Sequence, residues 1–191
     1  MYTNPSNLVK TVIGIIESNA VTINKVVRIY EPSATLTVWA GMRKSLPIDA
    51  FPSLEIEPTS GSNQWATTRS QRPRYSFQCT LTVVNANEEY GVEYIASVVE
   101  VLVNILTDPQ NLQARVVNER KWDPNVGLTD TYILDSFVDS VTYNASKDGT
   151  IRTADFEWWA TIHEPYPQSH WPRPGNCNKP TVVRPQIITP T

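Results

Sequence analysis

The chain has 191 residues, 40% of them hydrophobic and 18% charged, and a formal net charge of −3. This composition is typical of one folded domain with a sizeable core, and the negative charge disfavours nucleic-acid binding driven by the field of the whole molecule. No unbroken apolar run is long enough to span a bilayer, and Met1 to Asn7 lacks a signal-peptide pattern, so neither a membrane segment nor secretion is expected.

The first third of the chain predicts a helix followed by short strands. Asn4 and Pro5 form a capping pair, and the apolar residues from Leu8 to Ile16 continue a helix that should end near 18–20. Apolar and β-branched residues then predict short strands at Val26–Tyr30, Thr35–Trp39 and Leu54–Glu57. The polar residues 58–73 that follow are expected to form a long hairpin arm or a mobile loop.

Residues 74–106 carry the clearest pattern in the chain. Phe77, Cys79, Leu81 and Val83 fall on one face of a predicted strand, and polar residues fall on the other. A helix should begin near Asn87 and run to Leu106. Its apolar residues cover more than one face, since Val92, Val101, Val103 and Ile105 lie beside the main stripe. We therefore expect a second chain to cover part of this helix.

The remaining elements predict a closing pair of strands. Thr107 to Pro109 should end the helix, Leu112–Val117 is a candidate short edge strand, and 118–130 reads as a connection. Strands are predicted at Tyr132–Tyr143 and Ile151–His163, joined by a turn at 144–149. In the last strand, Ala154, Phe156, Trp158, Ala160 and Ile162 form an apolar face, and Trp159 interrupts the polar one.

The character of the chain changes after residue 163, which divides it into a domain at 1–163 and a proline-rich arm at 164–191. The arm shows no periodicity and reads as extended. Its apolar residues suit docking on a neighbour, although an arm folded on its own domain or left disordered is the alternative. These residues are Trp171, Val182, Val183, Ile187 and Ile188.

Catalytic and metal-binding patterns are weak. Residues 123–130 resemble a calcium loop, but the glycine is misplaced and the distal glutamate is missing, so an ordinary turn is favoured. Two cysteines and two histidines are too few and too scattered for zinc, and no cofactor, metal or enzymatic activity is expected. Asp135, Asp139, Asp155 and Glu157 on the closing strands predict a solvated face, or else an acidic surface that lines a channel or meets a basic partner.

One basic, aromatic patch is visible in and beside the polar segment. It consists of Trp65, Arg69, Arg72 and Arg74. Nucleic-acid contact is one interpretation, but arginines in an acidic protein more often mark a protein interface or a soluble loop. We take these residues as interaction candidates, together with Trp159 and the apolar residues of the arm.

The order of elements resembles that of the tail terminator, or tail completion, proteins of tailed bacteriophages. The opening helix at 4–18, the block at 74–106, the run Leu54–Glu57 and the closing pair that ends in 156–160 carry the resemblance. Together with the predicted elements, the resemblance implies an α+β fold. This fold is a single domain with a mainly antiparallel or mixed sheet, two main flanking helices, a long polar hairpin loop and an extended C-terminal arm.

The resemblance also implies a function and a set of partners. Such proteins form hexameric rings in the virion neck, cap the tail tube and join the head-tail connector, and DNA passes through the lumen without sequence-specific binding. The arm could reach a neighbouring subunit or, in a contractile tail, the sheath. The alternatives are a head-completion or connector protein, another tail assembly protein, and a non-viral α+β module that binds a ligand or a protein.

Overall fold

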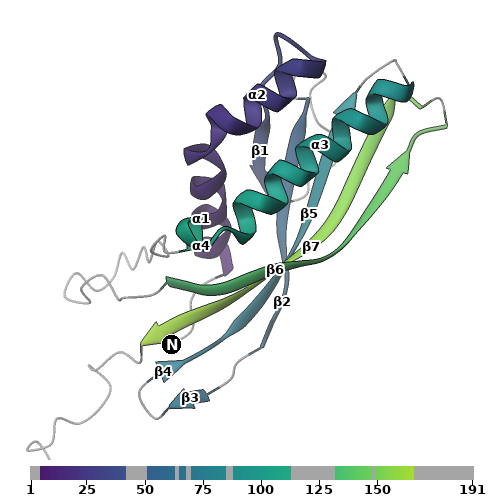
Figure 1. Ribbon diagram of the computed structural model, residues 1–191. Coiled ribbons are helices and arrows are strands. Elements are labelled where there is room, and N and C mark those ends of the chain that lie inside the picture. The colour runs from purple at the N-terminus through teal and green to yellow at the C-terminus, as the bar shows by residue number, and fades with distance from the viewer. Residues whose placement is uncertain are drawn as a thin grey trace, which may run out of the picture.

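The computed structural model describes residues 5–41, 51–62, 65–67, 70–84, 88–112, 132–147 and 149–165. Figure 1 shows a long twisted sheet with helices packed against its upper part. The helices are α1 (Pro5–Ser18), α2 (Ala20–Tyr30), α3 (Glu88–Thr107) and α4 (Pro109–Leu112). The strands are β1 (Thr37–Ala40), β2 (Ser53–Ser62), β3 (Trp65–Thr67), β4 (Ser70–Gln71), β5 (Arg74–Val84), β6 (Tyr132–Ala145) and β7 (Ile151–Pro165).

The sheet is mixed, which confirms the predicted α+β class. The order β1-β2-β5-β7 forms its main path, β6 pairs with β7, and β4 joins β7 to β3. β1 and β2 are parallel, whereas the other pairs are antiparallel. β7 is central to this arrangement because it pairs with β5, β6 and β4.

Strict alternation along β5 and β7 builds the core. The predicted apolar face of β5, from Phe77 to Val83, is fully buried, and so is the face of β7 from Ala154 to Ile162. Helices α1 and α3 contact the strands on this side. The described helices lie on one face of the sheet (Figure 1). The side chains that alternate in the other direction form a second face, which we call the open face because many of them are exposed or partly exposed, although Ser53, Glu55 and Ser76 on it are buried.

The predicted strand at Val26–Tyr30 is wrong, because these residues belong to α2. β-branched and aromatic residues favour a strand locally, but Ile23 and Val27 lie four residues apart and are both buried on one helical face. Tyr30 stacks on Tyr94 of α3 with ring centroids 5.0 Å apart, and its hydroxyl lies 3.1 Å from that of Ser97. Tertiary packing therefore overrides the local preference, and three long helices flank the sheet where two were expected.

Part of the apolar surface of α3, which the sequence suggested a second chain would cover, is covered within its own chain. Val101 and Val103 pack against the core of their own chain, and Ile105 is buried. By length and composition alone, the window Tyr90–Thr107 could cross a membrane, but its main stripe from Tyr94 to Leu106 packs in the core. Tyr90 and Val92 remain more than half exposed, at 57% and 55%.

The polar segment 58–73 is a hairpin rather than a plain loop. β2 continues to Ser62, and β5 begins opposite it, with Ser62 in register with Arg74. The short strands β3 and β4 pair with each other, and β4 pairs with the end of β7. Leu112 is the last residue of α4, while residues 113–131, with the rest of the predicted edge strand and the calcium-like loop, lie outside the described residues.

Candidate interaction surface

The open face presents a cluster of one guanidinium and two aromatic rings. Phe137 of β6 is in register with Trp159 of β7, and their rings are stacked with centroids 6.2 Å apart and an angle of 7° between planes. The guanidinium carbon of Arg74, on β5, lies 4.7 Å from the Phe137 centroid and 4.6 Å from the Trp159 centroid. The three adjacent strands β5, β7 and β6 each supply one member. We call these residues the Arg74 cluster.

Carboxylates lie around the Arg74 cluster on the same face. Asp135 is exposed and sits opposite Thr161, two residues from Trp159 along β7. Glu157 lies two residues from Trp159 in the other direction and is in register with Gln78, whose other neighbour is the exposed Glu57. Because residues two apart on a strand share a face, all of these side chains belong to the open face. The surface around the Arg74 cluster is therefore acidic.

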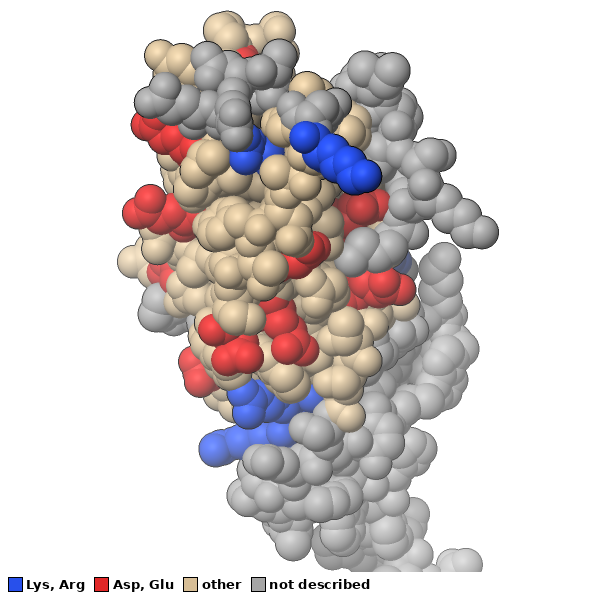
Figure 2. All heavy atoms as spheres, turned by 90° about the vertical axis from the view of Figure 1, so that its right-hand side faces the viewer, with Lys and Arg blue, Asp and Glu red and all other residues tan. Residues whose placement is uncertain are grey.

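Asp155 has local partners. Thr80 donates its hydroxyl to one carboxylate oxygen at 2.6 Å, and Asn144 donates its amide to the other at 3.2 Å. These bonds link β5, β7 and β6 across the open face. Seen from the right-hand side of Figure 1, Asp and Glu side chains spread over the middle of the molecule, and Lys and Arg lie toward its two ends (Figure 2).

The chemistry of the open face favours protein over nucleic acid as a partner. Trp, Phe and Arg are enriched in protein interfaces, where a ring stacked under a guanidinium offers a large contact area at low entropic cost. Arginine with aromatic rings can also stack on nucleic-acid bases. Here, however, the neighbouring carboxylates of Asp135 and Glu157 would repel the phosphates that supply most of the affinity for nucleic acid.

The structure brings together only part of the set predicted from the sequence. Arg74 and Trp159 meet in one cluster, whereas Arg72 is exposed and is not among its members. Trp65 lies in β3, but its side chain is outside the described residues, as is Arg69. The arm candidates are also outside them: Trp171, Val182, Val183, Ile187 and Ile188.

Phe137 is the member that sequence reasoning missed, and an irregular register explains why. Near the hairpin turn, Val141 pairs with Phe156, and extending that register regularly would place Phe137 opposite Ala160 on the buried face. A register shift between Val138 and Val141 turns Phe137 to the open face instead, opposite Trp159. No local pattern in the sequence marks this bulge.

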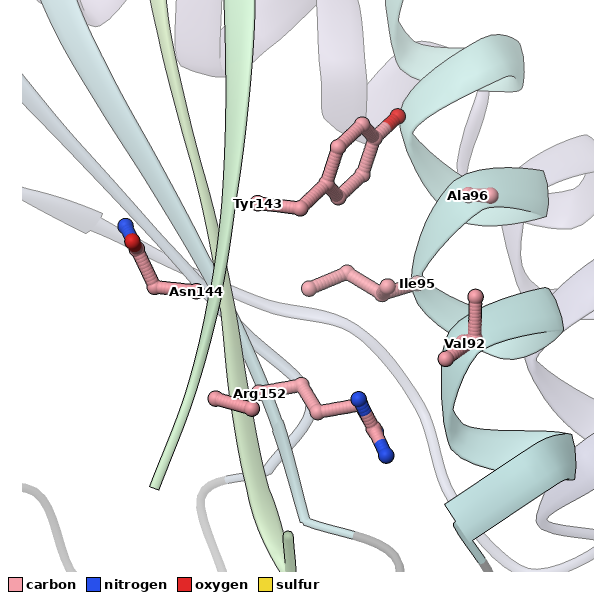
Figure 3. A pocket seen from close by; sticks show the side chains of 7 residues that line it. Val92, Ile95, Ala96, Tyr143, Asn144 and Arg152 are labelled. Atoms are coloured by element: carbon pink, nitrogen blue, oxygen red, sulfur yellow. The ribbon is translucent and has the colours of Figure 1, made fainter. Parts of the chain in front are cut away.

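A second feature is a small hollow between α3 and the hairpin of β6 and β7, with a volume of about 170 Å³. Val92, Ile95 and Ala96 line it from the helix, while Tyr143 and Arg152 point toward the helix from the strands (Figure 3). Asn144 points away, toward the open face where it bonds Asp155. The hollow is smaller than the pockets of roughly 300–1,000 Å³ that hold small-molecule ligands.

The histidine of β7 lies far from the carboxylate of Asp155. His163 lies eight residues from Asp155 along β7, which corresponds to roughly 26 Å in an extended strand. Asp139 falls in the irregular part of β6 and has no register partner there. Within the described ranges, no group of three or more His, Cys, Asp or Glu residues is placed to hold a metal ion.

Comparison with known proteins identifies the fold. No protein-family model and no curated protein matches the sequence. Among solved structures, 32 chains match by structure. One of them belongs to a structure described as "Virion of native gene transfer agent (GTA) particle", and it aligns with a TM-score of 0.55 and 12% sequence identity. The alignment covers 85% of this chain and 99% of that chain, so the two share a fold over nearly the whole of the virion chain.

Proposed function

We propose that this protein is a structural subunit of the neck of a phage-like particle, with the role of a tail terminator. In this role it would form a hexameric ring that caps the tail tube and joins the tail to the head connector. The observation that carries the proposal is the shared fold, which spans 99% of a chain in a gene transfer agent virion. The layout of the sequence, which resembles tail terminators, supports the finer role.

The open face supports a role in assembly. A ring subunit needs two different surfaces that meet its two neighbours, since a heterologous contact closes into a ring. The Arg74 cluster is a partly exposed aromatic centre on a mostly polar sheet face, with Phe137 36% exposed. Such a centre suits the core of a protein interface, and the surrounding polar side chains suit its rim.

The charge of the open face is in keeping with DNA that passes through the particle without sequence-specific binding. Glu57, Asp135 and Glu157 lie on it with Arg74 as the cation of the cluster. Carboxylates repel phosphates, so DNA would pass without being held. The same charge would disfavour the protein as a nucleic-acid-binding module.

The deciding experiment combines native mass spectrometry with negative-stain microscopy on the purified full chain, alone and mixed with tail tubes. Sixfold rings that bind one end of a tube are the expected result. A protein that stays monomeric with and without tubes would overturn the proposal. Rings that bind isolated connectors and ignore tubes would replace the terminator role with a connector role.

A matched pair of variants tests whether the open face takes part. Arg74→Glu reverses the charge of the cluster, and Lys25→Glu makes the same change on the exposed outer side of α2. We expect Arg74→Glu to reduce ring formation and Lys25→Glu to leave it unchanged. Equal effects of the two variants would show that net charge matters and that the Arg74 cluster does not.

A further inference from the structure

We propose that residues 166–191 of one copy dock on the open face of a second copy, around the Arg74 cluster. This inference deepens the proposed function, on which it rests, because it names a contact that would join neighbouring subunits. The occupant is a segment of this chain that lies outside the described residues. Three arguments support binding of this segment to the open face of a second copy: charge, side-chain chemistry and the position at which the chain leaves β7.

Charge is the first argument. Residues 166–191 contain three cations, Arg173, Lys179 and Arg184, and no Asp or Glu. The whole chain carries −3, so residues 1–165 carry a formal −6. The open face places Asp135, Glu157 and Glu57 where such cations can meet them. Opposite charges on the two surfaces steer their encounter and set their register.

Side-chain chemistry is the second argument. The Arg74 cluster offers two partly exposed rings, and the segment carries Trp171 and the aliphatic pairs 182–183 and 187–188 among its cations. An aromatic anchor against a half-buried aromatic centre, with charged pairs around it, is the arrangement of an interface hot spot. The segment is also rich in proline, so it loses less conformational entropy when it binds in an extended form.

The position at which the chain leaves the sheet is the third argument, and it favours docking of the segment on a second copy over docking on its own sheet. β7 ends at Pro165, and a proline at 167 disfavours helical backbone at the residue before it, so the sequence favours continuation away from the sheet over an immediate reversal. The 26 residues from 166 to 191 reach roughly 80 Å when extended. This exceeds the roughly 50 Å length of β7 and is enough to lie along the sheet of a neighbour.

Cross-linking tests the proposal with a cysteine that the segment already contains. Cys177 lies within it, whereas Cys79 is fully buried in the core, where burial raises the pKa of its thiol and keeps it unreactive. The acceptor is a tagged full chain with Glu157→Cys and Cys177→Ser, and the donor is the untagged natural chain. The two are mixed in equal amounts and treated with a short bis-maleimide.

The expected product is a conjugate of one tagged and one untagged chain. A control acceptor with Lys25→Cys and Cys177→Ser places the thiol on the outer side of α2 and should give several-fold less product. Donor variants Lys179→Glu and Arg184→Glu should lower the yield, and so should added salt, because it screens exposed charges. If Glu157→Cys does not fold, Thr161→Cys supplies a thiol on the same face.

Three outcomes would overturn the proposal: no conjugate, equal yield at residue 25, or cross-linking only within one chain when both thiols are present in it. The last result would mean that the segment folds on its own sheet. Failure here is distinguishable from failure of the proposed function. Rings that cap tubes but do not form this cross-link would support the terminator role and overturn the docking of residues 166–191. Copies that form the cross-link but do not bind tubes would support the docking and overturn the terminator role.

Discussion

The guanidinium carbon of Arg74 lies 4.6 Å from the centroid of the Trp159 ring, so a cation from β5 stacks on an aromatic side chain of the neighbouring strand. The ring of Phe137 from β6 completes the arrangement at 4.7 Å from the same carbon. The planar guanidinium and the two aromatic rings thus join β5, β6 and β7 on the open face. These contacts depend on the shape of the guanidinium as well as on its charge.

The first prediction separates shape from charge in this cluster. Arg74→Lys keeps the positive charge and removes the planar stacking group, so we expect a loss of about 0.5–1 kcal/mol in the free energy of unfolding. Trp159→Leu should remove the same interaction. In a double-mutant cycle followed by urea denaturation, the two losses should be less than additive. Full additivity would show that Arg74 and Trp159 do not interact.

The second prediction concerns the carbonyl oxygen of Leu106, near the end of α3. Ser136 donates its hydroxyl to it at 2.6 Å, and Trp158 donates its indole N–H at 3.2 Å, which fastens the helix to β6 and β7. We expect Ser136→Ala to cost about 1 kcal/mol and Trp158→Phe more, because the latter also leaves a cavity. The double variant should lose more than the sum, since it leaves a buried carbonyl without either donor. Ser18→Ala, at an exposed helix end, is the control for the loss of a serine.

The third prediction concerns a close approach of α3 to β7. A Cβ atom added at Gly91 would lie 2.5 Å from Nε and 3.0 Å from Cδ of Arg152. Gly91→Ala should therefore destabilise the protein by about 1–3 kcal/mol, despite the better helix propensity of alanine. In an Arg152→Ala background the same substitution should be stabilising, by up to about 1 kcal/mol.

Thermal denaturation of the four proteins in this cycle provides the measurement. Gly14→Ala is the matched control, because nothing lies within 4 Å of a Cβ at that helical position. It should stabilise the protein in both backgrounds. A stabilising Gly91→Ala in the natural background would show that Arg152 moves aside without cost.

The fourth prediction concerns pH. Burial raises the pKa of Glu31, and the hydrogen bond that Tyr94 donates to it at 3.1 Å lowers this pKa by a smaller amount. Because the folded state then holds the Glu31 proton more tightly than the unfolded state, the contribution of Glu31 to stability rises as pH falls through its raised pKa. At neutral pH the ionised carboxylate opposes folding.

Glu31→Gln should consequently raise the urea midpoint at pH 7, with an advantage that shrinks toward about pH 4, where the natural carboxyl is protonated. The glutamine oxygen can still accept from the Tyr94 hydroxyl, because burial raises the pKa of Tyr94 and keeps the hydroxyl protonated in the variant as well. Glu17→Gln, on the exposed side of α1, is the control and should show no such trend. An advantage independent of pH would contradict the assignment.

The sequence by itself determined the elements whose pattern is local and strong. Alternation identified β5 and β7 together with their buried faces, because one sheet face must be apolar and the period of a strand is two. The same local logic located α1, α3 and the mixed α+β class. Arg74 and Trp159 were recognised as interaction candidates from residue type alone.

Tertiary structure decided what depends on contacts distant in sequence. Val26 to Tyr30 became helical because Tyr30 packs on Tyr94, more than sixty residues away, and this packing outweighs the strand preference of its neighbours. The Arg74 cluster exists because a register shift in β6 moves Phe137 from the buried face to the open one. A shift of one residue reverses the direction of the side chains that follow it, until the second shift between Ile133 and Asp135 restores the original direction. Both shifts are set by the pairing of whole strands, so the residues around Phe137 carry no local sign of them.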